Sequence, residues 1–222
     1  PITFPAPDEL PPPLFSCDDV NLGYGTNTVL ENLNLRLDPN DRIALLGANG
    51  NGKSTFIRFL AGRLAPLAGT ETRPKKLRVG YFAQHQVDEL DMKATPFVEL
   101  SRRKPKDTPQ QVRNLLGGFG FSRDKSETPV ASLSGGEKAR LLFALMSLEK
   151  PHIMLLDEPT NHLDIDAREA LVEALNIYEG AVILVSHDAH LVNLVADRLW
   201  LGDEGTCGVF EGDLADYERP LL

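Results

Sequence analysis

Cysteine, basic charge and long apolar runs are scarce in this sequence. Its two cysteines, Cys17 and Cys207, stand alone without metal-ligand spacing. This argues against a zinc site or a redox pair and favours reduced thiols in a cytoplasmic protein. No apolar run reaches the roughly 18 residues that a membrane-spanning helix needs. The proline-rich beginning also lacks the basic and apolar stretches of a secretory signal.

The charge balance is acidic. Lys and Arg number 23 and Asp and Glu number 32, so the formal net charge is −9. This argues against a domain that holds nucleic acid on a broad basic face, although backbone dipoles can still bind a small phosphate ligand. The remaining composition, 42% hydrophobic and 25% charged, is typical of a globular domain. The one dense basic cluster is interpreted as a solvated helix end and contains Arg102, Arg103, Lys104 and Lys106.

Proline content divides the chain at residue 13. Residues 1–13 contain six prolines and are expected to form an extended linker that follows an earlier part of the protein. Residues 14–222 are expected to form one α/β domain. Antiparallel strands are predicted early in this domain, at Phe15–Leu22 and at Leu33–Leu37, where apolar and polar residues alternate.

Continuous apolar runs predict a parallel sheet, because strands buried on both faces of an α/β protein have this pattern. These runs are Ile43–Leu46, Ile153–Leu156 and Ala181–Val185. Helices are expected between them, at Lys53–Ala61 with Gly62 as a stop, Gly135–Leu148 and Asp166–Tyr178. Near the end, Leu199–Leu201 and Cys207–Phe210 are expected to form a closing hairpin.

The middle of the chain, residues 92–150, is predicted to be a mostly helical subdomain. Thr95 and Thr108 each precede a proline, which is the order of an N-cap residue and a first helical residue. Gln111 follows Thr108 by three residues and completes a capping box. The region therefore carries its own helix start signals.

The strongest motif is a phosphate loop that follows a predicted strand and opens a predicted helix. Glycines there let backbone N–H groups surround phosphates at a helix N-terminus. Lys53 is expected to reach the β- and γ-phosphates, and Ser54 is expected to bind Mg²⁺. The motif fits G-x-x-x-x-G-K-[ST] and consists of Gly47, Ala48, Asn49, Gly50, Asn51, Gly52, Lys53 and Ser54, with Thr55 next in the helix.

Polar residues follow two other buried strands, at what would be the same edge of the sheet. An Asp–Glu pair alone indicates a solvated turn. After a buried strand in a chain with a phosphate loop, however, Asp157 and Glu158 predict a metal-organising carboxylate and a base for the attacking water. His187 is either a structural hydrogen-bonding residue or a γ-phosphate contact, and the shared edge favours the second interpretation.

Three further signals are weaker on their own. A capping box at the start of the helix at 135–148 accounts for a serine and a glutamate but not for the two glycines between them. Each glycine costs about 1 kcal/mol relative to Ala in a helix. The glycines therefore favour a second phosphate contact at this helix N-terminus. This segment consists of Ser134, Gly135, Gly136 and Glu137. Gln84 follows a short apolar strand. Tyr24 lies between two glycines and is either a base-stacking ring or a turn residue.

Taken together, these motifs resemble the ATPase domain of the ATP-binding cassette (ABC) superfamily over residues 14–222. The resemblance implies a P-loop fold with a parallel-sheet core, an N-terminal antiparallel β subdomain and a helical subdomain. It also implies hydrolysis of ATP with Mg²⁺. The implied catalytic residues are Glu158, His187 and Gln84, and the implied metal ligands are Ser54, Gln84 and Asp157. Tyr24 would stack on adenine, and the segment 134–137 would contact the nucleotide of a partner cassette.

Within the superfamily, the segments Leu133–Arg140, Asp157–Asp164 and Phe210–Tyr217 resemble the ABC-F group. Proteins of this group have two tandem cassettes and no membrane domain, and many act as translation factors on the ribosome. The resemblance implies a second, C-terminal cassette that pairs head to tail with another cassette. Ribosome and tRNA are the implied partners of the full-length protein. The alternative is the ATP-binding subunit of an ABC membrane transporter.

One position departs from the family pattern. The usual glycine before the first buried strand is Asn40 here. Asparagine also tolerates the left-handed conformation, so the turn is expected to form.

Overall fold

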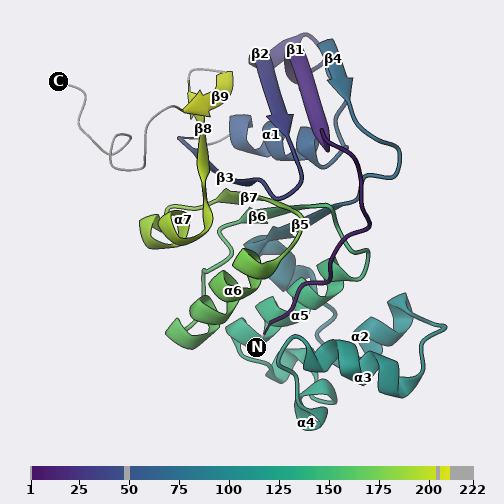
Figure 1. The fold of residues 1–222 in the computed structure, drawn as a ribbon. Helices are drawn as coiled ribbons and strands as arrows, with labels where there is room; N and C mark the ends of the chain where they lie inside the picture. Colours follow the sequence, from purple (N-terminus) through teal and green to yellow (C-terminus); the bar gives the residue numbers. More distant parts are fainter. Residues whose placement is uncertain (1, 48–50, 204–205, 211–222) are drawn as a thin grey trace.

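The computed structural model describes residues 2–47, 51–203 and 206–210, and contains two sheets with helices around them (Figure 1). The smaller sheet is antiparallel, with the order β2-β1-β4. Its strands are β1 (Phe15–Tyr24), β2 (Asn27–Leu37) and β4 (Ala68–Thr72). The two predicted strands are confirmed, and both are longer than the pattern indicated. All five residues of β4 are exposed, so this strand has no apolar alternation to reveal it.

The larger sheet has the order β5-β6-β7-β3-β8-β9. Its first five strands in that order are mutually parallel, and β9 closes the edge as an antiparallel hairpin with β8. The parallel core and the closing hairpin are therefore confirmed. The strands are β3 (Arg42–Leu46), β5 (Val79–Ala83), β6 (Ile153–Asp157), β7 (Ala181–Val185), β8 (Arg198–Asp203) and β9 (Thr206–Phe210).

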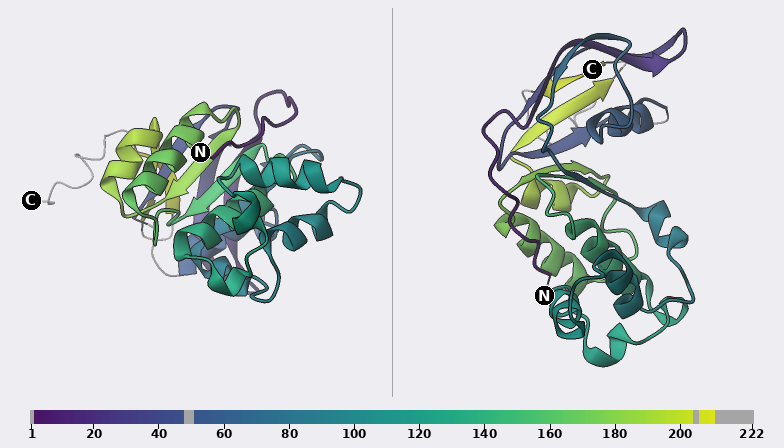
Figure 2. Two further views of the ribbon diagram at one scale, coloured as in Figure 1. Left: turned by 90° about the horizontal axis from the view of Figure 1, so that it is seen from below. Right: turned by 90° about the vertical axis from the view of Figure 1, so that its right-hand side faces the viewer.

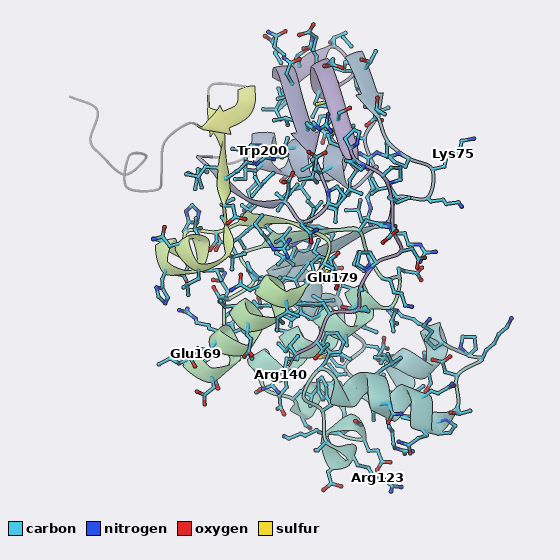
Figure 3. All side chains as sticks on the ribbon, in the orientation of Figure 1. Lys75, Arg123, Arg140, Glu169, Glu179 and Trp200 are labelled. Carbon is cyan, nitrogen blue, oxygen red and sulfur yellow. The ribbon has the colours of Figure 1, made fainter. Side chains whose placement is uncertain are left out.

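The larger sheet separates two hydrophobic cores, because side chains alternate between its faces. Leu45 faces the core that contains α1 (Asn51–Leu60) and the antiparallel sheet. Ala44 and Leu46 face the other core, which contains α5 (Gly135–Ser147), α6 (Ile165–Ile177) and α7 (Ala189–Val195). Trp200 on β8 is labelled in Figure 3 and is 1% exposed. It packs edge-on against Phe56 of α1.

The predicted helical subdomain is confirmed and lies beyond the face of the sheet that carries α5 (Figures 1 and 2). Thr95 and Thr108 cap their helices through the side chain, and Gln111 completes the capping box. The exposed Arg102 and Arg103 at the end of α2 also form ion pairs with Glu99. The subdomain consists of η1 (Gln84–Glu89), α2 (Pro96–Arg103), α3 (Pro109–Gly117), α4 (Arg123–Ser126), η2 (Val130–Ser132) and α5.

Helix boundaries differ slightly from the predictions, for local reasons. Helix α1 begins at Asn51, inside the phosphate loop, and Gly62 stops it with a φ of 79°. Helix α6 begins one residue earlier than predicted, because Asp164 caps it by accepting a hydrogen bond from the Ala167 N–H. Asn40 has a φ of 66°, which confirms the expected left-handed turn.

The proline-rich segment packs on the domain along part of its length. Within residues 2–13 it has no helix or strand, yet Ile2 and Phe4 are buried. The Thr3 N–H donates to the Gly118 carbonyl at 2.8 Å. Phe4 packs edge-on against Phe143 of α5. The division at residue 13 stays a prediction, and the segment contributes two side chains to the core.

Of the two cysteines, only Cys17 has a described side chain. Burial raises the pKa of the Cys17 thiol to about 11, so it is protonated and unreactive at neutral pH. The side chain of Cys207 lies outside the described part of the chain.

Among the helices of the described residues, none has the length and apolar character needed to cross a membrane.

Candidate functional site

The site lies where β3, β6 and β7 end at the carboxyl edge of the larger sheet. In register, Asp157 of β6 pairs with Val185 of β7, and Val185 pairs with Leu45 of β3. The phosphate loop follows β3, and His187 follows β7 by two residues. Ligands of open α/β sheets bind at this edge. The fold therefore brings the predicted loop, carboxylates and histidine together.

The phosphate loop is described at its two ends. Gly47 has a φ of 71°, a conformation that favours glycine, and Gly52 lies in the first turn of α1. Predicted ligands Ala48, Asn49 and Gly50 lie outside the described residues, as does the side chain of Asn51. The two ends alone already join β3 to the start of α1, as the motif predicts.

Lys53 is paired with Asp157 across the site. Lys53 Nζ lies 2.8 Å from Asp157 Oδ1, and the two side chains are 23% and 17% exposed. The atoms do not meet the geometry of a hydrogen bond, so the attraction is that of an ion pair. The lysine of the loop is thus held by the carboxylate that the sequence predicts to organise a metal.

Glu158 leaves the strand in a left-handed conformation. Its φ is 50°, which is uncommon for a residue other than glycine, and its N–H donates to the Val185 carbonyl at 2.7 Å. Its carboxylate accepts from the His187 N–H at 3.1 Å. The His187 Nε2 lies 3.6 Å from Glu158 Oε1, and the ring is 82% exposed. This turn separates the side chains of Asp157 and Glu158, which the sequence could place only as neighbours.

Gln84 follows β5, the strand that pairs with β6 so that Ala83 lies opposite Asp157. Its Oε1 is buried and has no hydrogen-bond partner among the described residues. A buried oxygen without a partner is costly and calls for an explanation, such as a catalytic role or a bound water or ion. This places an unsatisfied oxygen beside the strand that carries Asp157.

Oxygen donors at this edge fit Mg²⁺. The amide oxygen of Gln84, the carboxylate of Asp157 and the hydroxyl of Ser54 are the hard ligands that Mg²⁺ prefers. Within the described residues, no cluster of three or more His, Cys, Asp or Glu could form a metal cage. Mg²⁺ ordinarily binds through one or two carboxylates, substrate phosphates and waters, so a cage is not needed.

Tyr24 lies at the end of β1, and its side chain is 43% exposed. Its phenol oxygen accepts from Arg58 Nη1 at 3.1 Å and from Thr55 Oγ1 at 3.5 Å, and both donors lie on α1. The hydrogen bond from Thr55, assisted by Arg58, holds the pKa of Tyr24 below its ordinary value. The structure therefore brings Tyr24 to the helix that the phosphate loop opens. Arg58 was not among the predicted site residues, because nothing in its local sequence distinguishes it.

The segment 134–137 forms the start of α5. Ser134 Oγ accepts from the Glu137 N–H at 3.1 Å, and Glu137 Oε1 accepts from the Ser134 N–H at 2.9 Å, which confirms the capping box. Partial burial raises the pKa of Glu137, but the Ser134 N–H and the Lys125 ammonium outweigh it and bring the pKa below its ordinary value. Lys125 Nζ lies 3.2 Å from Glu137 Oε2.

Gly135 allows a close approach of the loop after Glu158. A Cβ added to Gly135 would lie 3.3 Å from the Cβ of His162, and one added to Gly136 would lie 3.8 Å from Leu163. His162 itself has a φ of 68°. Close packing is thus a second reason for Gly135, alongside the predicted phosphate contact, whereas a Cβ at Gly136 would make only an ordinary van der Waals contact.

The start of α5 lies away from Lys53 of the phosphate loop. Helix α5 packs in one core and α1 in the other, so the larger sheet lies between them (Figure 1). Among the described residues, no hydrogen bond or ion pair links Ser134 or Glu137 to Lys53. The two groups of predicted ligands therefore lie apart, and we call them the two predicted half-sites.

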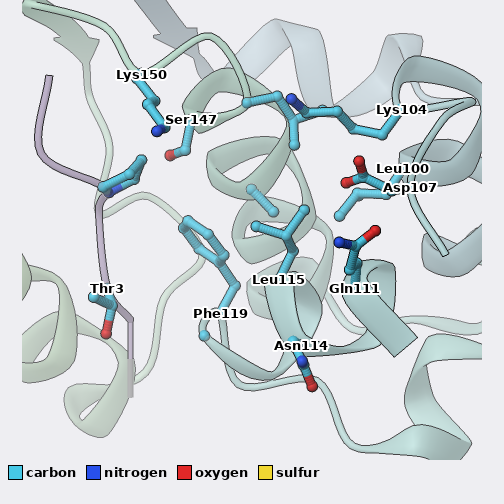
Figure 4. A pocket seen from close by; sticks show the side chains of 14 residues that line it. Thr3, Leu100, Lys104, Asp107, Gln111, Asn114, Leu115, Phe119, Ser147 and Lys150 are labelled. Carbon is cyan, nitrogen blue, oxygen red and sulfur yellow. The ribbon is translucent and has the colours of Figure 1, made fainter. Parts of the chain in front are cut away.

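The helical subdomain contains a pocket of about 490 Å³ (Figure 4). It is bordered by Thr3, by Leu115 and Phe119 of the α3 region, and by Lys104 and Lys150. None of the predicted site residues lines it. The pocket therefore has no part in the chemistry of either half-site.

A phosphate loop after one parallel strand, with a carboxylate pair at the end of another, defines a nucleotide-binding ATPase domain of the P-loop class. The family model described as "ABC transporter" matches residues 30–161. The chain belongs to this family, as an ABC ATPase domain.

Its relatives include proteins of the ABC-F group. "Probable ATP-binding protein YheS" of Escherichia coli is 48% identical over 99% of this chain and 34% of its own length. "ABC transporter F family member 3" of Arabidopsis thaliana is 42% identical over 98% of this chain and 31% of its own length. The chain thus spans about a third of the length of the curated relatives it matches.

The fold is that of solved ABC ATPase structures. The structure of cbiO1 from Clostridium perfringens, part of the transporter complex cbiONQ, aligns with a TM-score of 0.73. The alignment covers 88% of this chain and 86% of cbiO1 at 24% sequence identity. This likeness confirms the predicted antiparallel subdomain and parallel core.

Proposed function

We propose that this chain binds and hydrolyses ATP as one cassette of an ABC-F protein. The observation that carries the proposal is the meeting of Lys53, Asp157, Glu158 and His187 at one sheet edge. Each of these groups has a different task in phosphoryl transfer, and one edge gathers them all. Membership of the ABC ATPase family supports the same conclusion.

The chemistry follows from the positions of these groups. Lys53 would leave Asp157 to contact the β- and γ-phosphates, since a dianionic phosphate competes well for its charge. Glu158 would orient and polarise the attacking water, and His187 would contact the γ-phosphate from its exposed position. Mg²⁺, held by Ser54, Gln84 and Asp157, would neutralise charge that develops on the phosphate oxygens.

The ATP site would be completed by a second cassette facing head to tail. Support comes from the two separated half-sites, with the start of α5 on the other side of the sheet from α1. A capped helix N-terminus with two glycines presents bare N–H groups to an anion. The relatives are about three times longer than this chain, which leaves room for another cassette.

The full-length protein is proposed to act in the cytoplasm on the ribosome, with tRNA nearby. The support is the identity of 48% and 42% to relatives of the ABC-F group, compared with 24% to a transporter ATPase. The acidic charge of this cassette implies that RNA contacts lie largely outside it.

Cosedimentation with ribosomes tests this proposal. Full-length protein carrying Glu158→Gln would be centrifuged with ribosomes in the presence of ATP, ADP or no nucleotide. Retention in the ribosomal pellet with ATP alone is the expected result, because blocked hydrolysis preserves the closed state. Equal retention under all three conditions, or none, would remove the ribosomal part of the proposal. Loss of ATP binding by the protein would remove the whole of it.

A further inference from the structure

Tyr24 and Arg58 form a bridge between the antiparallel sheet and α1. Arg58 Nη1 donates to the phenol oxygen at 3.1 Å, and the guanidinium carbon lies 6.0 Å from the centre of the ring. Thr55, one helical turn before Arg58, approaches the same oxygen at 3.5 Å. Two successive turns of α1 thus hold the hydroxyl of a residue that comes from a different sheet.

The bridge leaves much of Tyr24 exposed. The side chain of Tyr24 is 43% exposed, whereas Thr55 below it is 1% exposed. An aromatic face stacks on a flat ring system, and a ring already fixed at its hydroxyl loses little further freedom when it does so. The hydrogen bonds therefore prepare a stacking surface at a defined place above the start of α1.

Arg58 has no competing carboxylate partner in the described part of the chain. Every ion pair of the described residues joins other basic side chains to carboxylates, and none includes Arg58. Arg58 is itself exposed. An exposed arginine without a carboxylate ordinarily samples many conformers, so its hydrogen bond to Tyr24 is the contact that places it.

We infer that Arg58 is a positioning residue that fixes the ring of Tyr24 for stacking on the base of the nucleotide. The inference rests on the proposed ATP site and adds to it a determinant of base recognition on α1. Because Arg58 acts through the ring, its effect depends on the ligand having a base. The binding of a ligand that consists of phosphates alone does not depend on the position of the ring.

Nucleotide titration of the 222-residue chain tests this inference. Isothermal calorimetry would compare ATP with inorganic tripolyphosphate, which has neither base nor ribose, in a Glu158→Gln background that prevents hydrolysis. Arg58→Ala is expected to weaken the binding of ATP about three- to tenfold, as the loss of one hydrogen bond does. The affinity for tripolyphosphate is expected to change less than about twofold. Tyr24→Phe keeps the ring but removes the hydrogen bonds from both Arg58 and Thr55, so it is expected to weaken ATP binding at least as much as Arg58→Ala does. Arg58→Lys is expected to restore part of the affinity that Arg58→Ala loses.

Two controls make the result decisive. Arg36→Ala removes an exposed charge from β2, where Arg36 pairs with Asp38, and is expected to leave both ligands unchanged. The double variant Tyr24→Phe/Arg58→Ala is expected to bind ATP no more weakly than Tyr24→Phe alone, because Tyr24→Phe already removes the bond that Arg58 makes. Equal losses for ATP and tripolyphosphate, additive losses in the double variant, or unchanged ATP binding in Arg58→Ala would each overturn the inference. A wild-type chain that binds neither ligand would instead overturn the proposed function.

Discussion

The carboxylate of Glu158 is tied to the backbone of His187, not to its ring. The His187 N–H donates to Glu158 at 3.1 Å, whereas the imidazole is 82% exposed and its Nε2 lies 3.6 Å away. The main chain after β7 therefore orients the proposed base, while the ring remains free to reach a phosphate. The left-handed φ of Glu158 is part of the same arrangement.

Glu158→Gln is expected to lower ATP hydrolysis by at least about 100-fold and to preserve ATP binding. The amide keeps the size of the side chain but cannot accept a proton from water. Phosphate release by full-length protein, together with nucleotide titration, measures both quantities. Glu169→Gln on α6, an exposed position, is the matched control (Figure 3). Hydrolysis at the wild-type rate in Glu158→Gln would assign the base to another residue.

Lys53→Ala is expected to weaken ATP binding about 10- to 100-fold, because it removes a charge-assisted hydrogen bond to the phosphates. The same change leaves Asp157 without its partner at 2.8 Å. Lys75→Ala, on the exposed segment between β4 and β5, removes the same charge away from the site (Figure 3). Calorimetry with ATP distinguishes the two variants. Equal affinities would show that the loop binds without its lysine.

Ser134→Ala separates a role in the partner site from a role in stability. It removes an N-cap, which costs about 1 kcal/mol, or a fall of about 2–4 °C in Tm. Binding of ATP by this chain alone is expected to be unchanged, whereas hydrolysis by the two-cassette protein falls. Thr95→Ala removes the corresponding cap of α2 and is the control. Thr95→Ala should match the Tm change and keep full activity. A matching loss of activity in Thr95→Ala would reduce Ser134 to a structural residue.

Arg42→Ala is expected to destabilise the domain by about 3 kcal/mol. The guanidinium is buried and donates to the carbonyls of Leu175, Tyr178 and Gly180, which tie the end of α6 to β3. Burial lowers the pKa of Arg42, but the residue remains a cation at neutral pH. Urea unfolding measures the change, with the exposed Arg36→Ala as control. A change below about 1 kcal/mol would mean that water replaces the lost donors.

Stability is expected to fall with pH in part through His152. Burial lowers the pKa of His152 below its ordinary value of 6.5, and its Nδ1 accepts from the Arg78 N–H at 3.0 Å. Below pH 6.5 the unfolded state binds a proton that the folded state does not, so the free energy of unfolding decreases as pH falls. Urea unfolding at about pH 7.5 and about pH 5.5 is expected to show a smaller pH dependence in His152→Gln than in wild type. Equal pH dependence would exclude this histidine as the source.

Much of the site could be predicted from the sequence, because its residues belong to short motifs with fixed spacing. A phosphate loop needs its glycines and lysine at fixed spacing, and the buried runs before Asp157 and His187 identify parallel strands from composition alone. Parallel strands end at a common edge, so the order of motifs predicts which side chains meet. The caps at Thr95 and Ser134 are equally local, since each needs only a hydroxyl and a glutamate or backbone N–H three residues on.

Features that depend on contacts between distant segments could not be predicted from the sequence. Strand β4 is exposed throughout and has no apolar pattern, and it joins the sheet by pairing with β1, which is distant in sequence. Arg58 becomes a candidate only when the end of β1 reaches α1. The left-handed turn at Glu158 depends on the carbonyl of Val185, which lies on a different strand. The burial of Phe4 likewise depends on aromatic partners far along the chain.

The alternation of side chains along β3 has a thermodynamic consequence. Leu45 belongs to the core around α1 and Leu46 to the core around α5. The same strand therefore forms one side of both cores. Neither can melt while the other stays intact, and unfolding should be cooperative across the whole sheet. The phosphate loop and the start of α5, although they belong to different half-sites, therefore share one folding transition.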